Sequence, residues 1–117
     1  MTVKQISMVS ERGLQISVAL AGSFRLRLRG LLGRDINALG GLLLRPCNQI
    51  HCIGMAYAID AVYLSREGRV LKLEEAIPPG KCCRRVAKSR SVLELPAGTA
   101  AELGFVPGSR WLCRSEA

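Results

Sequence analysis

The chain has 117 residues, of which 49% are hydrophobic and 22% are charged, and these proportions are typical of a globular protein rather than a disordered one. No apolar run approaches the ~20 residues of a membrane-spanning helix, and the charged N-terminal segment is unlike a signal peptide. We therefore expect a single cytoplasmic domain over residues 1–117 with no membrane span. The net charge of +8, from 17 Lys and Arg against 9 Asp and Glu, is an ambiguous signal: it is compatible with an anionic partner, protein or nucleic acid, but does not identify one.

Two pairs of segments show the alternation of polar and apolar residues that strands have. Residues 2–9 and 14–20 flank Ser-Glu-Arg-Gly, in which Gly13 tolerates a positive φ, so we predict an antiparallel hairpin. Residues 59–65 and 69–76 flank Arg-Glu-Gly and predict a second hairpin. The first strand of this second hairpin has apolar residues on both faces, and we expect both faces to be covered.

Residues 23–34 fit two patterns. Phe24, Leu26 and Leu28 alternate with arginines, as in a strand, whereas Phe24, Leu28 and Leu31 also fit one face of a helix. Gly33 stands where a helix often ends. Periodicity leaves both alternatives open.

The remaining segments are shorter. An apolar run ends at Pro46, residues 84–88 and 91–95 are strand candidates, and a last strand follows Pro107. Residues 99–104 carry a capping box and predict a helix of one or two turns. With a helix at 23–34 the total is about seven strands and two short helices. The predicted class is α+β, mainly antiparallel β, in a compact, partly open barrel-like domain.

The five cysteines predict reduced thiols, because an odd number cannot all pair and the neighbours Cys82 and Cys83 cannot bridge to each other in normal geometry. We expect most of them to be buried as small apolar side chains. Cys47, His51 and Cys52 have a spacing that zinc could use, but adjacent Cys82 and Cys83 would point in opposite directions if extended. We therefore expect no metal and no cofactor.

His51 is the only histidine and could act as a general base near neutral pH, with Asp60 orienting its ring. The alternative is that His51 bonds a carbonyl of the sheet and that Asp60 caps a turn or a backbone amide. No serine or cysteine nucleophile is tied to this pair by sequence, so we lean against catalysis.

The basic residues fall into three clusters along the chain. They are Arg25, Arg27, Arg29 and Arg34; Lys81, Arg84, Arg85, Lys88 and Arg90; and Arg110 and Arg114. They form either a solvated face or, if the first two clusters meet, a patch for RNA, DNA or an anionic protein. None of the five aromatic residues is interleaved with them as a base-stacking platform would require.

Four segments in order carry a family resemblance: RLRGLLGR (27–34), GLLLRP (41–46), IHCIGMAYAIDAVYLSREGRVL (50–71) and VLELPAGTAAELG (92–104). Over about residues 14–114 the chain resembles the domain-of-unknown-function 192 family of small prokaryotic proteins. The resemblance implies a strand-rich, barrel-like domain with the R-G-L-x-G-R box on a helix, and no established reaction, ligand or cofactor. The candidate binding residues on its motif positions are Arg27, Gly30, Arg34, His51, Met55 and Asp60.

We expect a non-catalytic binding or interaction module with a basic surface. Two alternatives stay open: a small enzyme or ligand-binding barrel with its site around His51 and Asp60, and an RNA- or DNA-binding protein.

Overall fold

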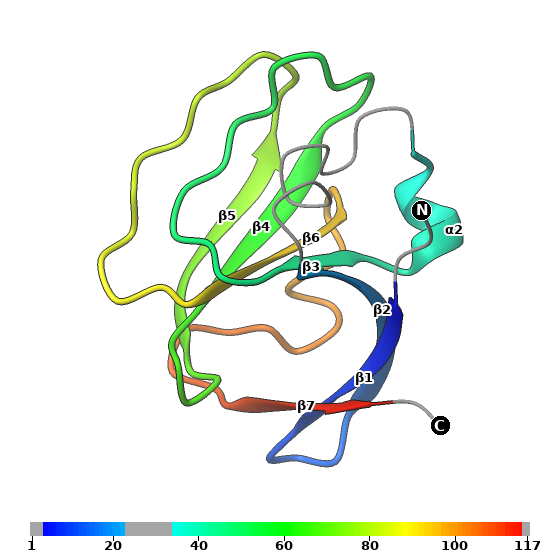
Figure 1. Ribbon diagram of the computed structural model, residues 1–117, viewed down its shortest axis with the longest axis vertical. Coiled ribbons are helices and arrows are strands. Elements are labelled where there is room, and N and C mark those ends of the chain that lie inside the picture. Colours follow the sequence, from blue (N-terminus) through cyan, green and yellow to red (C-terminus); the bar gives the residue numbers. More distant parts are fainter. Residues whose placement is uncertain (1–3, 23–33, 116–117) are drawn as a thin grey trace.

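The computed structural model describes residues 4–22 and 34–115, and their regular secondary structure is mainly strand (Figure 1). The strands are β1 (Lys4–Ser10), β2 (Gln15–Ala21), β3 (Leu42–Leu44), β4 (Ile59–Leu64), β5 (Val70–Ile77), β6 (Ser91–Pro96) and β7 (Trp111–Ser115). The described residues contain one short helix, α2 (Ile36–Leu39), between the N-cap Asp35 and Gly40, whose φ is 77°. The fold is thus mainly β, and the predicted α+β class with two helices holds only roughly.

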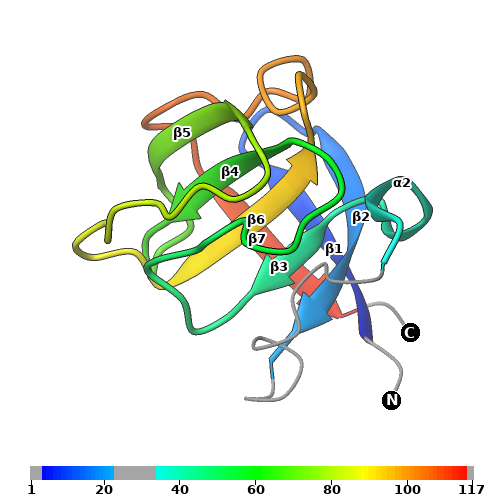
Figure 2. The same cartoon turned by 90° about the horizontal axis from the view of Figure 1, so that it is seen from above.

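The seven strands form one sheet in the order β5-β4-β6-β3-β2-β1-β7. Every neighbouring pair is antiparallel except β2 and β3. The sheet curls until β7 lies beneath β6 and β3 (Figures 1 and 2). Its edge strands meet at one end only, where Arg69 pairs with Arg110 and the Val70 amide donates to the Ser109 carbonyl at 2.8 Å. This half-barrel confirms the predicted partly open barrel.

The sheet buries an apolar cluster on each face. In β4 every residue is buried, with Ile59, Ala61 and Tyr63 in one cluster and Val62 and Leu64 in the other. The prediction that this strand is covered on both faces is confirmed. The first cluster is covered by the long segments on either side of β4 and β5, and we call this side the loop face. The second cluster lies inside the curl, which we call the inner face.

Both predicted hairpins are present. The β1–β2 turn is closed by the Ser10 amide, which donates to the Leu14 carbonyl at 2.8 Å, and Gly13 has the expected positive φ of 85°. The β4–β5 turn requires Gly68, whose φ is 84° and whose missing Cβ would run into the Trp111 carbonyl oxygen. These turns set the register that aligns the apolar residues of each strand pair.

Two local predictions are wrong. Residues 99–104 form turns rather than a helix, because the Thr99 hydroxyl donates to the Pro96 carbonyl at 2.6 Å instead of capping the following amides. Residues 84–88 are not a strand, since the Val86 amide bonds the Asn48 carbonyl and the chain turns at Lys88, where φ is 69°. The helix predicted over 23–34 falls almost wholly outside the described residues. No helix among those described is long and apolar enough to cross a bilayer.

Candidate functional site

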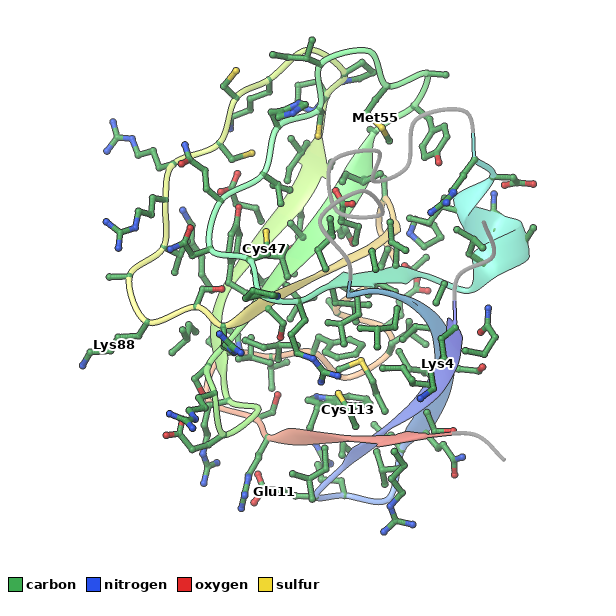
Figure 3. All side chains as sticks on the ribbon, in the orientation of Figure 1. Lys4, Glu11, Cys47, Met55, Lys88 and Cys113 are labelled. Carbon is green, nitrogen blue, oxygen red and sulfur yellow. The ribbon has the colours of Figure 1, made fainter. Side chains whose placement is uncertain are left out.

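Four arginines line a pocket of about 300 Å³ at the end of the half-barrel where its edge strands meet. We call it the arginine pocket, and its arginines are Arg45, Arg66, Arg90 and Arg110. They come from four different segments: the end of β3, the β4–β5 turn, the residue before β6 and the residue before β7. The inner wall includes Met8 and Trp111 of the inner-face cluster. Cys113, at one wall of the pocket, lies below β3 in Figure 3.

Hydrogen bonds to backbone carbonyl groups hold the arginine pocket in shape. The Arg90 amide donates to the Leu64 carbonyl at 2.8 Å, and this bond fixes the start of β6 against the end of β4. Arg110 Nε donates to the Glu67 carbonyl at 3.0 Å, which ties the residue before β7 to the β4–β5 turn. The Arg45 amide donates to the Ala21 carbonyl at 3.2 Å. The pocket is therefore built on the sheet rather than on a free loop.

The charge in the arginine pocket is largely uncompensated. Of the described residues that line it, Glu67 is the only acidic one, and against four arginines this leaves an excess of three positive charges. Among residues 4–22 and 34–115, none of the four arginines forms an ion pair with a carboxylate. Neighbouring Arg69, by contrast, pairs with Glu11 at 3.3 Å. Desolvation raises the pKa of Cys113, and the Arg45 guanidinium beside it acts in the opposite direction.

Uncompensated guanidinium groups at one pocket suit oxyanions. Arginine offers several N–H donors in a fixed fork that matches phosphate and carboxylate oxygens. The described stretches offer no exposed aromatic ring: Tyr63, Phe105 and Trp111 are buried, and Tyr57 is half-buried. The pocket thus presents donors of the kind that anionic groups require, and the described residues give it no exposed ring on which a base could stack.

The pair proposed for acid–base catalysis is not brought together. Asp60 is fully buried, and its carboxylate accepts the amides of Ala76 at 2.8 Å and Ala100 at 3.0 Å. His51 is exposed in a two-residue antiparallel bridge with Cys82. Within the described part of the chain the two side chains share no hydrogen bond. Asp60 therefore has the structural role that the sequence left open as the alternative.

The other sequence candidates are scattered. Met55 packs on the loop-face cluster and lies above β3 and β6 in Figure 3, on the opposite side from Cys113. The Arg34 carbonyl accepts the Tyr57 hydroxyl at 2.8 Å. Arg27 and Gly30 lie outside the described residues. Cys47, His51 and Cys52 do not form a metal site, because no group of three or more His, Cys, Asp or Glu side chains in the described segments could hold an ion.

The sequence clusters did not identify the arginine pocket. Arg90 and Arg110 belong to two of the predicted clusters, whereas Arg45 and Arg66 stand alone in the sequence and belong to none. The sequence around these two residues offered only a weak signal of the pocket. Arg45 follows an apolar strand and Arg66 sits in a hairpin turn, and residues at such positions lie at an end of a barrel. Only the sheet order brings the four together.

Comparison with known proteins agrees with this fold. A profile of the domain-of-unknown-function 192 family, described as uncharacterised ACR, matches residues 7–112 and confirms the resemblance. A crystal structure of a protein of unknown function from Novosphingobium aromaticivorans superposes with a TM-score of 0.77 at 18% identity, covering 94% of this chain and 84% of that one. A crystal structure of a putative transcription regulator from Sinorhizobium meliloti gives 0.76 at 21% identity, covering 96% and 94%. No curated protein matches the chain.

Proposed function

Because the chain belongs to the domain-of-unknown-function 192 family, which is uncharacterised, we propose a function from its own geometry: a non-catalytic module that binds an anionic partner through the arginine pocket. The supporting observation is the set of four arginines on one pocket with no carboxylate partner among the described residues. Like charges placed together repel one another and reduce stability. An anionic ligand removes that repulsion when it binds.

The surface beside the pocket extends the positive charge. The segment that leads into Arg90 carries exposed Arg84, Arg85 and Lys88, and Lys88 projects from its outer edge in Figure 3. Two acidic residues, Asp60 and Glu94, are buried and cannot offset this charge at the surface. An extended anionic partner can therefore contact the pocket and the adjoining segment together.

Replacing Arg66 and Arg90 together with serine should weaken binding of an anionic probe by about tenfold or more, because two charge-assisted hydrogen bonds are lost. Both side chains are exposed, so we expect the variant to stay folded. The measurement is fluorescence anisotropy with three labelled probes: a short DNA duplex, a single-stranded RNA and a polyglutamate peptide. For the duplex, the slope of log K against log[salt] should become shallower by about 2, because each phosphate contact contributes about 0.9.

The matched control is the Lys4→Ser/Arg12→Ser variant, which loses the same charge from exposed positions outside both the pocket and the adjoining segment 84–88. It should keep most of the affinity. Equal losses in the two variants would show that binding follows overall charge and not the pocket. Failure of all three probes to bind the unmodified chain at low salt would refute the proposed function.

A nucleic acid is the second candidate for the partner. It is favoured by the phosphate-binding chemistry of arginine, and one structural neighbour is called a putative transcription regulator. The lack of exposed aromatic rings in the described segments predicts contact with the phosphate backbone and little base preference. Tighter binding of the peptide than of either nucleic acid would decide for an anionic protein.

A further inference from the structure

His51 and Cys82 lie directly opposite each other in a short antiparallel bridge between two loop segments. The flanking hydrogen bonds define the kind of pair: the Cys52 amide donates to the Lys81 carbonyl at 2.7 Å, and the Cys83 amide donates to the Ile50 carbonyl at 3.1 Å. These bonds lie on either side of the pair and not between its members. His51 and Cys82 are therefore a non-hydrogen-bonded pair, the closer of the two antiparallel types, with Cα atoms about 4.5 Å apart.

The two side chains share the solvent side of this bridge. His51 and Cys82 are exposed, whereas their neighbours Cys52 and Cys83 are buried. The Cβ atoms of directly opposite residues lie about 4.5–5.5 Å apart, so rotation about χ1 can bring an imidazole nitrogen to the sulfur. The backbone that holds the pair is anchored by the buried neighbours on both strands.

The charges around the pair are mainly positive. Lys81 precedes Cys82 and its Nζ lies 3.6 Å from a carboxylate oxygen of Glu74, so its charge is partly balanced. Arg84 and Arg85 follow on the same segment, are exposed and have no ion pair among the described residues. A thiolate is stabilised by nearby cations, and an anionic reagent is attracted to them.

We propose that Cys82, with His51 as its general base, is a thiol-exchange site for small anionic disulfides such as glutathione disulfide. His51 takes the Cys82 thiol proton, and the thiolate attacks one sulfur of the reagent. The reagent S–S bond breaks as the new bond to Cys82 forms, and the leaving thiolate carries away the electron pair and takes up a proton. The Cys82 sulfur is oxidised and the released half is reduced, so atoms and electrons balance. The site is separate from the arginine pocket and does not depend on the proposed function.

The other cysteines provide internal comparisons. Burial raises the pKa of the Cys52 thiol to about 11, and burial also raises the pKa of Cys83. Cys113 is exposed, as Cys82 is, but the residue opposite it is Met8. The rate of exchange at Cys113 therefore shows how fast an exposed thiol reacts when no imidazole lies opposite it.

The test is to incubate the folded chain with glutathione disulfide at neutral pH and to locate the mixed disulfide by peptide mass spectrometry. Cys82 should be modified first, and Cys82→Ser should abolish that fast phase. His51→Ala should slow the rate constant at Cys82 by about tenfold or more. His51→Gln, a second variant, keeps a polar side chain and should be equally slow. The melting temperature of each variant is measured first, and rates are compared only among variants that melt at the same temperature as the unmodified chain.

Reagent charge gives an independent readout. Arg84→Ser/Arg85→Ser should slow exchange with anionic glutathione disulfide and leave exchange with cationic cystamine unchanged or faster. Modification of Cys113 by cystamine as fast as that of Cys82 would overturn the proposal, and so would an unchanged rate in both His51 variants. Cationic cystamine is used for this comparison because Cys113 lines the arginine pocket, whose charge attracts an anionic reagent. The His51 variants are read at Cys82, which does not line the arginine pocket, so their result does not depend on whether that pocket binds an anion.

Discussion

Replacing Glu94 with glutamine should remove a loss of stability that the unmodified chain undergoes as the pH rises from about 4.5 to about 8. Glu94 lies in the middle of β6 with its side chain on the loop face, between Leu42 of β3 and Ala61 of β4. It is 5% exposed, and the described residues offer its carboxyl group no hydrogen bond or ion pair. Burial raises the pKa of Glu94 from 4.5 to about 8.

The sign of the pH effect follows from proton linkage. The pKa is higher in the folded state, so between pH 4.5 and 8 the folded chain holds a proton that the unfolded chain has released. The contribution of the neutral carboxyl group is complete below pH 4.5 and is lost as the pH rises to about 8. At 1.36 kcal/mol per pKa unit the full loss is on the order of 5 kcal/mol.

The measurement is urea unfolding at intervals between pH 5 and pH 8.5, which stays below the titration of the buried thiols. In the Glu94→Gln variant the free energy of unfolding should change little with pH. At pH 8.5 this variant should be more stable than the unmodified chain. Glu75→Gln is the matched control, since Glu75 is an exposed glutamate of β5, which β4 separates from β6 in the sheet. Parallel curves for the unmodified chain and Glu94→Gln would contradict the prediction.

The alternation of polar and apolar residues, together with the turn residues, was sufficient to predict the two hairpins of the sheet. The β1–β2 and β4–β5 hairpins follow from the period of two and from Gly13 and Gly68, because these signals lie within a few residues of one another. The burial of β4 on both faces follows from the sequence as well, because apolar residues stand at both its odd-numbered and its even-numbered positions. Helix α2 was missed, although Asp35 and Gly40 are good cap residues, because its four residues are too few for a periodic pattern.

Tertiary contacts decided the segments where local signals failed. Thr99 has the residue type of an N-cap, but the amide of the next residue, Ala100, bonds the buried Asp60 carboxylate. Forty residues separate these two groups in the sequence. The candidate site was partly missed for the same reason. Arg45, Arg66, Arg90 and Arg110 meet only because β3 and β4 end, and β6 and β7 begin, at the same end of the half-barrel. A pattern in the sequence records neighbours along the chain and not the order of strands in a sheet.

Replacing Asp60 with alanine should destabilise the chain by about 3–5 kcal/mol, because two backbone amides lose their acceptor inside the protein. The first amide belongs to Ala76, whose φ of 50° marks a bulge where β5 shifts register against β4. The second belongs to Ala100, which is buried in the inner-face cluster. One carboxylate thus joins the β5 bulge to the turn that covers the inner face.

Asp60→Asn should cost roughly half as much, because the amide oxygen can still accept from one of the two N–H groups while the new NH₂ faces the other. The matched control is Asp35→Ala, which removes an exposed aspartate that also accepts a backbone amide, that of Asn37 at 3.0 Å. Its cost should be about 1 kcal/mol, as for other N-caps. Urea unfolding at neutral pH measures all three variants. If Asp60→Ala costs no more than Asp35→Ala, the carboxylate does not join the two elements, and Asp60 becomes available again for the chemistry once assigned to it with His51.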